Sequence, residues 1–350
     1  MNNKPFQGLK VVELASVLAG PAVGMFFAEL GAEVIKVENP KTGGDITRQW
    51  KSSSEKSGDS SAYYASVNWG KMILFLDFTN EKDRNQLTEI IKTADLLLMN
   101  FKAGDAEKYA LDFPHLSAQF PKLICGYISG YGENDPRPAF DLVMQAETGF
   151  MSMNGTPESG PLKMPVAIID IMAAHQLKEG LLTALYLREK TGKGNCVRVA
   201  LFDSAIASLA NQASNFLVTG IVPQMTGSLH PNIAPYGETF LCGDGKYMVL
   251  AIGTEKQFAR FCIATGRPEL INDVRFSTNQ VRVGNRMEIP ELFASFFIKR
   301  PAADAAELLR QSEIPFAIIQ SVEDALTAPA AEHLILDYQT VKTAIFRLTY

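Results

Sequence analysis

A single carboxylate interrupts the apolar stretch KMPVAIIDIMAAHQ, residues 163–176. Asp170 follows the strand-like run VAII and precedes a helical pattern, so it stands where a helix begins. Two uses of a carboxylate fit that position. It can cap the helix by accepting backbone N–H bonds. It can also be kept ionised by the helix macrodipole and then attack a thioester or abstract a proton.

The other short motifs argue against two common enzyme classes. The turn ASVLAGPAVG, residues 15–24, lacks the G-x-G-x-x-G pattern, which disfavours dinucleotide binding and leaves Glu38 with a structural role. Ser129 is not framed as G-x-S-x-G, so a serine hydrolase is disfavoured. His175 offers that serine no base, and it lies about 140° around the helix from Asp170.

Composition limits the partners further. Lys plus Arg total 33 against 38 Asp plus Glu, and the net charge of -5 argues against nucleic acid. No apolar run reaches the roughly 18 residues of a membrane span, and the chain starts without a signal-peptide pattern. We therefore expect a cytoplasmic protein that does not associate with a membrane. The spacing of Cys and His predicts no disulfide framework and no metal site; the cysteines are Cys125, Cys196, Cys242 and Cys262.

The elements that must position Asp170 alternate between strand and helix. Strands are predicted at 10–14, 33–37, 72–77, 95–99 and 123–128, with helices at 21–30, 80–93 and 105–120. A helix over 171–190 ends at TGKGN, and VRVALFDS then reads as another strand. This alternation predicts an open α/β sheet that binds ligands at the carboxyl ends of its strands.

The last third of the chain has a different pattern. A loop rich in Gly, Pro, Asn and His runs from Met225 to Tyr236, and a hairpin with an Asp244-Gly245 turn follows at 238–253. Helices are predicted near 255–265, 285–297 and 301–312. We expect a smaller α+β domain, because 350 residues exceed what one core usually holds.

Six stretches, in order over nearly the whole chain, resemble the class III CoA-transferase family, which also includes the alpha-methylacyl-CoA racemases. They are GLKVVELASVLAGPAVGMFFAELGAEVIKVENPKTGGDITR, ADLLLMNFKAG, GYGENDPRPAFDLVMQAETGF, DIMAAHQLKEGLLTALYLREKTGKGNCVRVALFDS, APYGETFLCGDGKYMVLAIG and IPFAIIQSVEDAL. The resemblance implies a Rossmann-like large domain at 1–220, a small α+β domain at 221–326, and a segment at 327–350 that returns towards the large domain. It also implies two subunits interlocked as a homodimer.

The resemblance places the family's catalytic aspartate at Asp170. This residue would attack an acyl-CoA to give an aspartyl mixed anhydride and CoA thiolate. The thiolate would then attack the anhydride to give an aspartyl-CoA thioester. A small carboxylic acid would then accept the CoA. Two covalent intermediates retain the free energy of the thioester if water is excluded. CoA or acyl-CoA is thus a substrate, and no tightly bound cofactor is expected.

The family pattern also implies a CoA site. CoA needs apolar walls, backbone donors and a few cations. The matching positions are Leu18, Ala19, Asn39, Leu76, Asn100, Phe101, Lys108 and Arg137. Lys108 stands where an arginine commonly binds the CoA phosphates, and lysine keeps the charge without the bidentate fork. His230 and Asn232, in the loop predicted to cover the active site, either touch the acyl group or are polar loop residues.

The sequence leaves two alternatives to a CoA-transferase, and the first is an alpha-methylacyl-CoA racemase-like enzyme. Racemases of the family have a histidine before the aspartate of a GHD pattern, whereas this chain has Phe140 there, and a phenyl ring carries no proton. The chain also ends at TVKTAIFRLTY, where family members usually continue, and it has Ala174 where they often have glycine. A catalytically degenerate CoA-binding protein is therefore the second alternative.

Overall fold

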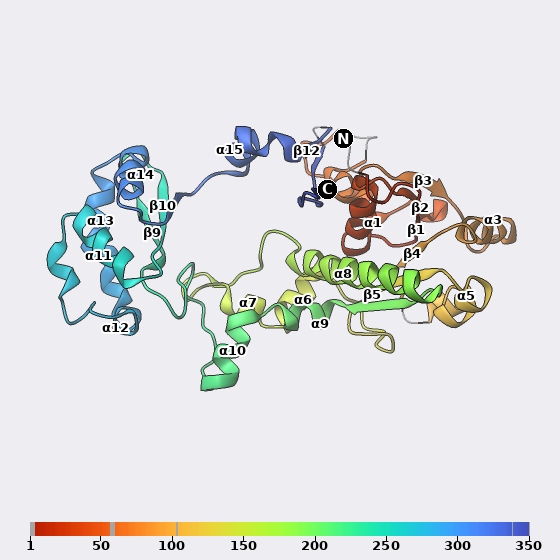
Figure 1. Ribbon diagram of the computed structural model, residues 1–350, viewed down its shortest axis with the longest axis horizontal. Helices are drawn as coiled ribbons and strands as arrows, with labels where there is room; N and C mark the ends of the chain where they lie inside the picture. Colours follow the sequence, from red (N-terminus) through yellow and green to blue (C-terminus); the bar gives the residue numbers. More distant parts are fainter. Residues whose placement is uncertain (1–3, 57–59, 103, 338, 350) are drawn as a thin grey trace. The chain divides into compact units, whose positions relative to one another are not determined.

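The computed structural model describes residues 4–56, 60–102, 104–337 and 339–349 (Figure 1). The chain falls into two compact units. The large unit comprises Met1–Met151, Lys163–Ser214 and Glu332–Tyr350, and the small unit comprises Ser152–Leu162 and Asn215–Ala331. The domain boundaries expected from the sequence, 1–220, 221–326 and 327–350, stay a prediction.

The large unit is built on a six-stranded sheet in the order β3-β2-β1-β4-β5-β8. All five neighbouring pairs are parallel, which confirms the predicted open parallel α/β sheet. The strands are β1 (Lys10–Glu13), β2 (Glu33–Glu38), β3 (Met72–Phe75), β4 (Leu96–Met99), β5 (Ile124–Ser129) and β8 (Cys196–Ala200).

Alternate residues of these strands enter two different apolar clusters. Val11 and Leu96 belong to one cluster, while Val12 and Leu97 belong to another. Such alternation is required when helices cover both faces of a sheet, because successive strand side chains point to opposite faces. The first cluster includes residues of α1 (Ala19–Glu29), α8 (Ile168–Thr191) and α9 (Leu201–Ala207), and the second includes residues of α3 (Glu81–Ile91) and α5 (Phe113–Gln119).

Shorter elements of this unit depart from the predicted pattern. The helix predicted at 105–120 is two helices, α4 (Asp105–Lys108) and α5, because Ala110 between them adopts a φ of 55°. The stretch VRVALFDS is β8 followed by α9 rather than one strand. Elements that the sequence did not predict are α2 (Ala62–Asn68), α6 (Asp141–Glu147), η1 (Pro40–Thr42) and η2 (Ile46–Gln49). Two further helices that it did not predict, α7 (Phe150–Met153) and α10 (Ala210–Thr219), each extend across a boundary between the two units.

The carboxyl-terminal segment packs on the large unit beside α1 (Figure 1). The Glu29 carboxylate, at the end of α1, accepts the backbone N–H groups of Thr343 and Ala344. Phe346 contacts Phe26 with 6.2 Å between the ring centroids. The segment contains η5 (Pro329–Leu334), β12 (Ile335–Leu336) and β13 (Thr340–Val341).

The small unit has an antiparallel sheet in the order β11-β10-β9, and the hairpin turn at Asp244-Gly245 is confirmed. Its own apolar core combines this sheet with three helices. The strands are β9 (Tyr236–Leu241), β10 (Tyr247–Ala251) and β11 (Phe316–Ile318), and the helices are α11 (Glu255–Ala264), α13 (Ile289–Ile298) and α14 (Ala302–Gln311). Smaller elements are β6 (Gly155–Thr156), β7 (Gly160–Pro161), η3 (Pro268–Ile271), α12 (Asn279–Gly284), η4 (Arg286–Glu288) and α15 (Val322–Thr327).

Candidate active site

The predicted site residues gather at one edge of the parallel sheet. Asn39 follows β2, Leu76 follows β3, and Asn100 and Phe101 follow β4. Leu18 precedes the first residue of α1, after β1. Because all strands run parallel, these positions lie at the same edge. The strand order reverses between β1 and β4, and ligands of open α/β sheets bind beside such a switch point.

Asp170 is the third residue of α8 and is only 7% exposed. Its neighbour Ile169 belongs to the same buried apolar cluster as Ala19 and Val23 of α1, and α8 packs against α1. Within the described part of the chain, the carboxylate of Asp170 receives no hydrogen bond and forms no ion pair. A buried carboxylate without such a partner is destabilised in its charged form.

The helix start is capped by a different carboxylate, so the N-cap interpretation of Asp170 is wrong. Asp141, at the start of α6, accepts the backbone N–H groups of Ile169 at 2.7 Å and of Asp170 at 3.3 Å. The amide of Gln145 donates to the other oxygen of Asp141 and accepts the N–H of Met164. Side chains of α6 therefore fix the segment that leads into α8.

These surroundings raise the pKa of Asp170 from 3.8 to about 7, first through burial and second through the negative charge of Asp141. The sequence suggested that the helix macrodipole keeps Asp170 ionised, which would lower its pKa. In the structure the pKa is raised instead. Burial and the nearby charge of Asp141 both disfavour the ionised form. A carboxyl group with a pKa near neutrality and little contact with water is suited to nucleophilic or acid/base chemistry.

Tyr63 is a further titratable side chain that interacts electrostatically with Asp170. Burial raises its pKa to about 12, with further contributions from the charges of Asp170, Asp141 and Asp45. Its ring lies edge-on to Trp50, with 5.1 Å between the centroids. Tyr63 therefore faces the same group of carboxylates as Asp170 and is protonated at neutral pH.

Beneath the site, four buried charges form a chain of ion pairs. Lys36, fully buried in β2, lies 3.0 Å from Glu13 and 3.1 Å from Asp45. Burial opposes the charged form, yet the carboxylates of Glu13 and Asp45 raise the pKa of Lys36. Lys71 reaches the second oxygen of Glu13 at 2.8 Å, and burial lowers its pKa to about 7. The network connects β1 and β2 with Asp45, the residue before η2.

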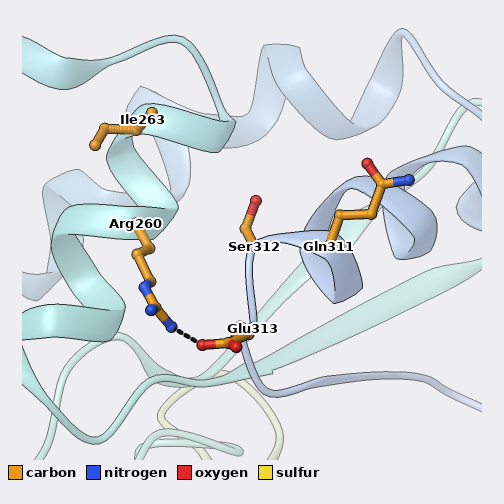
Figure 2. A pocket seen from close by; sticks show the side chains of 5 residues that line it. All are labelled: Arg260, Ile263, Gln311, Ser312 and Glu313. Atoms are coloured by element: carbon orange, nitrogen blue, oxygen red, sulfur yellow. Dashed lines mark hydrogen bonds and ion pairs between the residues drawn. The ribbon is translucent and has the colours of Figure 1, made fainter.

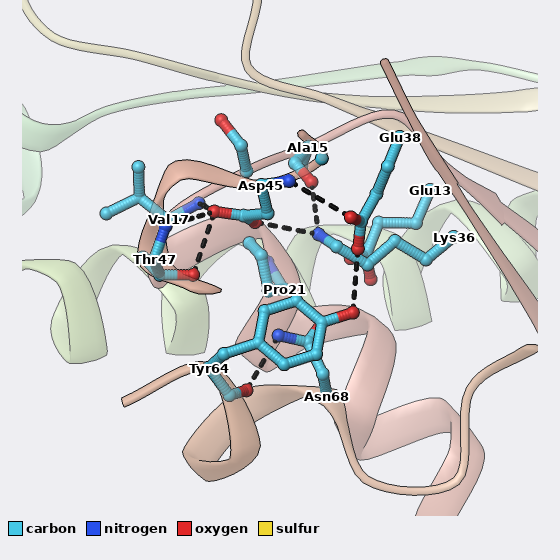
Figure 3. Close-up of polar contacts among 12 residues, drawn as sticks. Glu13, Ala15, Val17, Pro21, Lys36, Glu38, Asp45, Thr47, Tyr64 and Asn68 are labelled. Atoms are coloured by element: carbon cyan, nitrogen blue, oxygen red, sulfur yellow. Dashed lines mark hydrogen bonds and ion pairs between the residues drawn. The ribbon is translucent and has the colours of Figure 1, made fainter. Parts of the chain in front are cut away.

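Glu38 has the structural role that the sequence suggested. Its carboxylate accepts two bonds from the guanidinium of Arg48, one from the hydroxyl of Tyr64 and one from the backbone N–H of Asp45. Figure 3 shows the contacts of Glu38 with Tyr64 and Asp45 beside the Lys36 network. Although burial works in the other direction, the bonds from Arg48, Tyr64 and Asp45 lower the pKa of Glu38. The charge of Arg48 is therefore already paired.

The predicted CoA residues fall into two groups. Leu18, Ala19, Asn39, Leu76, Asn100 and Phe101 border the sheet edge described above. Lys108 ends α4 and lies over the ring of Tyr109, 5.2 Å from its centroid, without an ion pair among the described residues. Arg137 lies in the loop after β5, where it forms an ion pair with Asp135 at 2.7 Å and stacks on Tyr131.

His230 and Asn232 belong to the small unit and are fixed by contacts within that unit. The N–H of Asn232 donates to the His230 ring at 3.1 Å, and the Asn232 amide pairs with that of Asn215. A hollow elsewhere in this unit is lined by Arg260, Ile263, Gln311, Ser312 and Glu313 (Figure 2). It contains none of the predicted site residues, and an ion pair between Arg260 and Glu313 lies in it.

Sequence reasoning did not select Asp141, Tyr63 or Asp45. Asp141 had a usable signal, because an acidic residue opens the helical stretch DLVMQAE and is followed four residues later by Gln145. The charges of Glu13 and Lys36 inside the apolar strands were a second signal, since such residues are buried only when paired. Tyr63 had no local signal.

Two further searches of the described residues gave negative findings. No cluster of three or more His, Cys, Asp or Glu side chains could hold a metal ion. Likewise, no helix in residues 4–56, 60–102, 104–337 and 339–349 is both long and apolar enough to cross a membrane.

A doubly wound parallel sheet, together with a buried carboxyl group at the start of α8 whose pKa lies near neutrality, defines the chain as an α/β protein with an enzyme-like site. Comparison with known proteins gives the family. The chain matches the family described as CoA-transferase family III over residues 6–344, and it belongs to that family. The predicted resemblance and the predicted class of enzyme are thereby confirmed.

Individual relatives agree with this assignment. The chain is 36% identical to the succinate–glutarate CoA-transferase of Agrobacterium fabrum, with 94% of this chain and 83% of that protein covered. It is 32% identical to the human succinyl-CoA:glutarate CoA-transferase, over 95% of this chain and 76% of that protein. A crystal structure of a CAIB/BAIF family protein from Brucella suis superposes with a TM-score of 0.85 at 37% identity, covering 99% of this chain and 93% of that one.

Proposed function

We propose that this chain moves CoA from an acyl-CoA donor to a small carboxylic acid, with Asp170 as the nucleophile. The observation that supports this most directly is the buried carboxyl group of Asp170, with a pKa raised to about 7, in a chain of CoA-transferase family III. Burial leaves the ionised form poorly solvated and therefore reactive. It also keeps water from the covalent intermediates.

The reaction proceeds through four bond exchanges. An oxygen of Asp170 attacks the thioester carbonyl and CoA thiolate leaves, which forms a mixed anhydride. The thiolate then attacks the aspartyl carbonyl and expels the donor's carboxylate, leaving an aspartyl-CoA thioester. The acceptor carboxylate attacks this thioester and releases the thiolate again. Finally the thiolate attacks the acceptor's carbonyl, and the Asp170 carboxylate is regenerated.

The CoA is proposed to lie along the carboxyl edge of the sheet. Leu18, Ala19, Leu76 and Phe101 would supply its apolar contacts, and Asn39 and Asn100 would supply polar ones. For the phosphates, Lys108 is supported by a charge that is unpaired among the described residues. The proposed contact with Arg137 is weaker, because Asp135 already neutralises that guanidinium.

The relatives suggest which substrates to try first. Two of them are named for succinate or succinyl-CoA and glutarate, and another, from Acetobacter aceti, is named an acetyl-CoA:oxalate CoA-transferase. Glutarate and oxalate are both short dicarboxylic acids. We propose an acceptor of that class, and succinyl-CoA with glutarate is the first pair to test.

We also propose a homodimer, interlocked as in the family resemblance. The support is an apolar stretch in α10 and just after it that is widely exposed in the single chain, with Leu217 78% and Val218 83% exposed. Phe216, Ile221 and Val222 continue it. Contiguous apolar surface of this kind usually marks an interface. The free thiols of all four cysteines support the proposal of a reducing, cytoplasmic location.

The racemase alternative has less support. Phe140 immediately precedes Asp141 and its ring is exposed at the start of α6, so this position offers no second acid/base group. A degenerate CoA-binding protein would bind CoA without forming a covalent adduct. The experiment must therefore detect the adduct itself.

The test is intact-mass spectrometry after mixing the protein with succinyl-CoA and other acyl-CoAs, with hydroxylamine to trap the activated carboxyl group. We expect a hydroxamate at Asp170 that is absent in Asp170→Asn. Asp83→Asn is the matched control, because that carboxylate serves only the Asp77 region. CoA binding with no adduct from any donor would contradict the proposal. Exchange of the α-proton in deuterated water would then favour the racemase alternative.

A further inference from the structure

The turn between β1 and α1 has an unusual backbone. Val17 adopts a φ of 73°, a left-handed conformation that is strained for a β-branched residue. The next residues are Leu18 and Ala19, which begin α1 and are proposed to contact CoA. Something must therefore hold Val17 in place, because a free turn would relax towards an ordinary conformation.

Three side chains from three other segments hold this turn. Lys36 donates to the carbonyl oxygen of Ala15 at 2.7 Å. Asn100 accepts the N–H of Ser16 at 3.0 Å and donates to its carbonyl oxygen at 2.8 Å. Asp45 accepts the N–H of Val17 at 3.1 and 3.4 Å. Each of three consecutive residues is thus fixed from outside the turn.

Asp45 is the central member of this arrangement. The same carboxylate that accepts the N–H of Val17 also forms the ion pair with Lys36 and accepts the N–H and the hydroxyl of Thr47 (Figure 3). Its own N–H is held by Glu38. Because Asp45 is 5% exposed, these contacts are shielded from water.

The turn has little freedom to adjust. A Cβ at Gly20 would overlap the Cβ of Ala15, so the first turn of α1 already lies against the end of β1. The first turn of α1 contains no acidic residue and no side chain caps it. Asp45 is therefore the carboxylate that orients the backbone immediately before Leu18.

We propose that Asp45 is a positioning residue for CoA transfer: through the N–H of Val17 it fixes the start of α1 against which the acyl-CoA binds. The inference rests on the proposed function, because the acyl-CoA is placed at Leu18 and Ala19 by that proposal. Asp45 itself does not touch the substrate in this account. Loss of Asp45 displaces the backbone of Leu18, and small displacements of a binding element lower reaction rates strongly.

The test exploits the backbone conformation of Val17. In Asp45→Asn, an NH2 group that cannot accept a hydrogen bond replaces either Oδ2, which serves Val17 and Lys36, or Oδ1, which serves Thr47, and the charge beside Lys36 is lost. We expect kcat/KM for CoA transfer from succinyl-CoA to glutarate to fall by about tenfold or more. Glycine adopts a positive φ without strain. Adding Val17→Gly to Asp45→Asn should therefore recover at least about threefold of the loss. Recovery of this kind is not expected if Asp45 merely stabilises the fold through Lys36.

Two further variants complete the design. Glu29→Gln removes another carboxylate that accepts backbone N–H groups, at the opposite end of α1, and should leave kcat/KM within about threefold of wild type. Asp45→Glu keeps a charge beside Lys36 but moves the acceptor away from Val17. It replaces Asp45→Asn if the latter does not fold.

Binding of desulfo-CoA, measured by calorimetry on the same proteins, separates the two proposals. A wild type that binds desulfo-CoA but transfers no CoA contradicts the proposed function. The inference is then decided by the dissociation constants, which should rise in the Asp45 variant and recover with Val17→Gly. A wild type that neither binds nor transfers overturns both. A folded Asp45 variant with unchanged kcat/KM and affinity, or a loss that Val17→Gly does not reduce, overturns the inference alone.

Discussion

At the scale of residues, Asp170 connects the structure with the pH dependence of the proposed reaction. Only the ionised carboxylate can attack a thioester, and burial with the charge of Asp141 raises the pKa to about 7. We therefore expect kcat/KM for CoA transfer to increase as the pH rises from 5 to 8, with an acid limb near pH 7. Steady-state rates across this range measure the limb directly.

Asp141→Asn is the matched variant for this prediction. It removes the negative charge but keeps an oxygen that can accept the N–H of Ile169. The acid limb should then move to lower pH by about half a unit to one unit, while burial still holds it above the ordinary value. A limb near pH 4 in the wild type would contradict this prediction, because it would mean that the pKa of Asp170 is not raised or that another carboxyl group must ionise.

The same pKa shift predicts how Asp170 affects stability. Its folded-state pKa lies above the unfolded value, so the protein gains protons on folding between about pH 4 and 7 and loses stability as the pH rises through that window. Asp170→Asn removes this loss. We expect the variant to be more stable than wild type by about 2 to 4 kcal/mol at pH 8 and by much less at pH 4. Urea unfolding at both pH values tests this, and equal differences at the two would contradict it.

The residues of the site differ in how well they could be predicted from the sequence. Asp170 was identifiable because a lone carboxylate interrupts an apolar run. Its cap could not be assigned, because Asp141 lies 29 residues earlier and meets the helix only through tertiary packing. The same applies to Asp45 and Val17, whose contact crosses 28 residues and depends on a backbone angle that local propensity does not predict.

At the scale of elements, α8 packs closely against β8 through a glycine. A Cβ at Gly180, in the middle of α8, would overlap the Cγ1 of Val197. Alanine is normally the better helix former by about 1 kcal/mol. Here we expect Gly180→Ala to destabilise the protein by about 1 to 3 kcal/mol, because the overlap must be relieved by moving the helix or the strand.

Urea unfolding of a double-mutant cycle tests the cause. Val197→Ala removes the overlapping methyl groups, so Gly180→Ala should cost less in that background, or become stabilising. An equal cost in both backgrounds would mean that contact with Val197 is not the reason.

The strands were predicted better than the short helices, and the reason is physical. The clearest case is β4, whose sequence LLLM is a continuous apolar run that is buried on both faces. By contrast, α2 and α6 are helices of only seven residues each, too short to display an apolar period over several turns. The break between α4 and α5 depends on the left-handed Ala110, and alanine gives no sequence signal for such a conformation.

At the scale of the whole molecule, the order of elements is what the sequence predicted most reliably. Alternating strands and helices imply a parallel sheet with right-handed crossovers, which leaves few possible topologies. The return of the chain to the large unit at Glu332–Tyr350 came from the family resemblance. Local pattern could not predict it, because Glu29 and Thr343 are separated by 314 residues.

The proposed interlocked homodimer has a kinetic consequence that an ordinary surface dimer lacks. Subunits that pass through each other separate only when a chain unfolds, and unfolding of stable domains is slow. We expect light scattering to give twice the chain mass of 38.3 kDa. When isotope-labelled and unlabelled dimers are mixed, native mass spectrometry should detect no mixed dimer until the proteins are unfolded together and refolded.

Leu217→Asp with Val218→Asp should prevent that reassembly, whereas Val274→Asp with Met287→Asp, equally exposed in the single chain, should not. A monomer, or mixed dimers that form within minutes under native conditions, would contradict the interlocked arrangement.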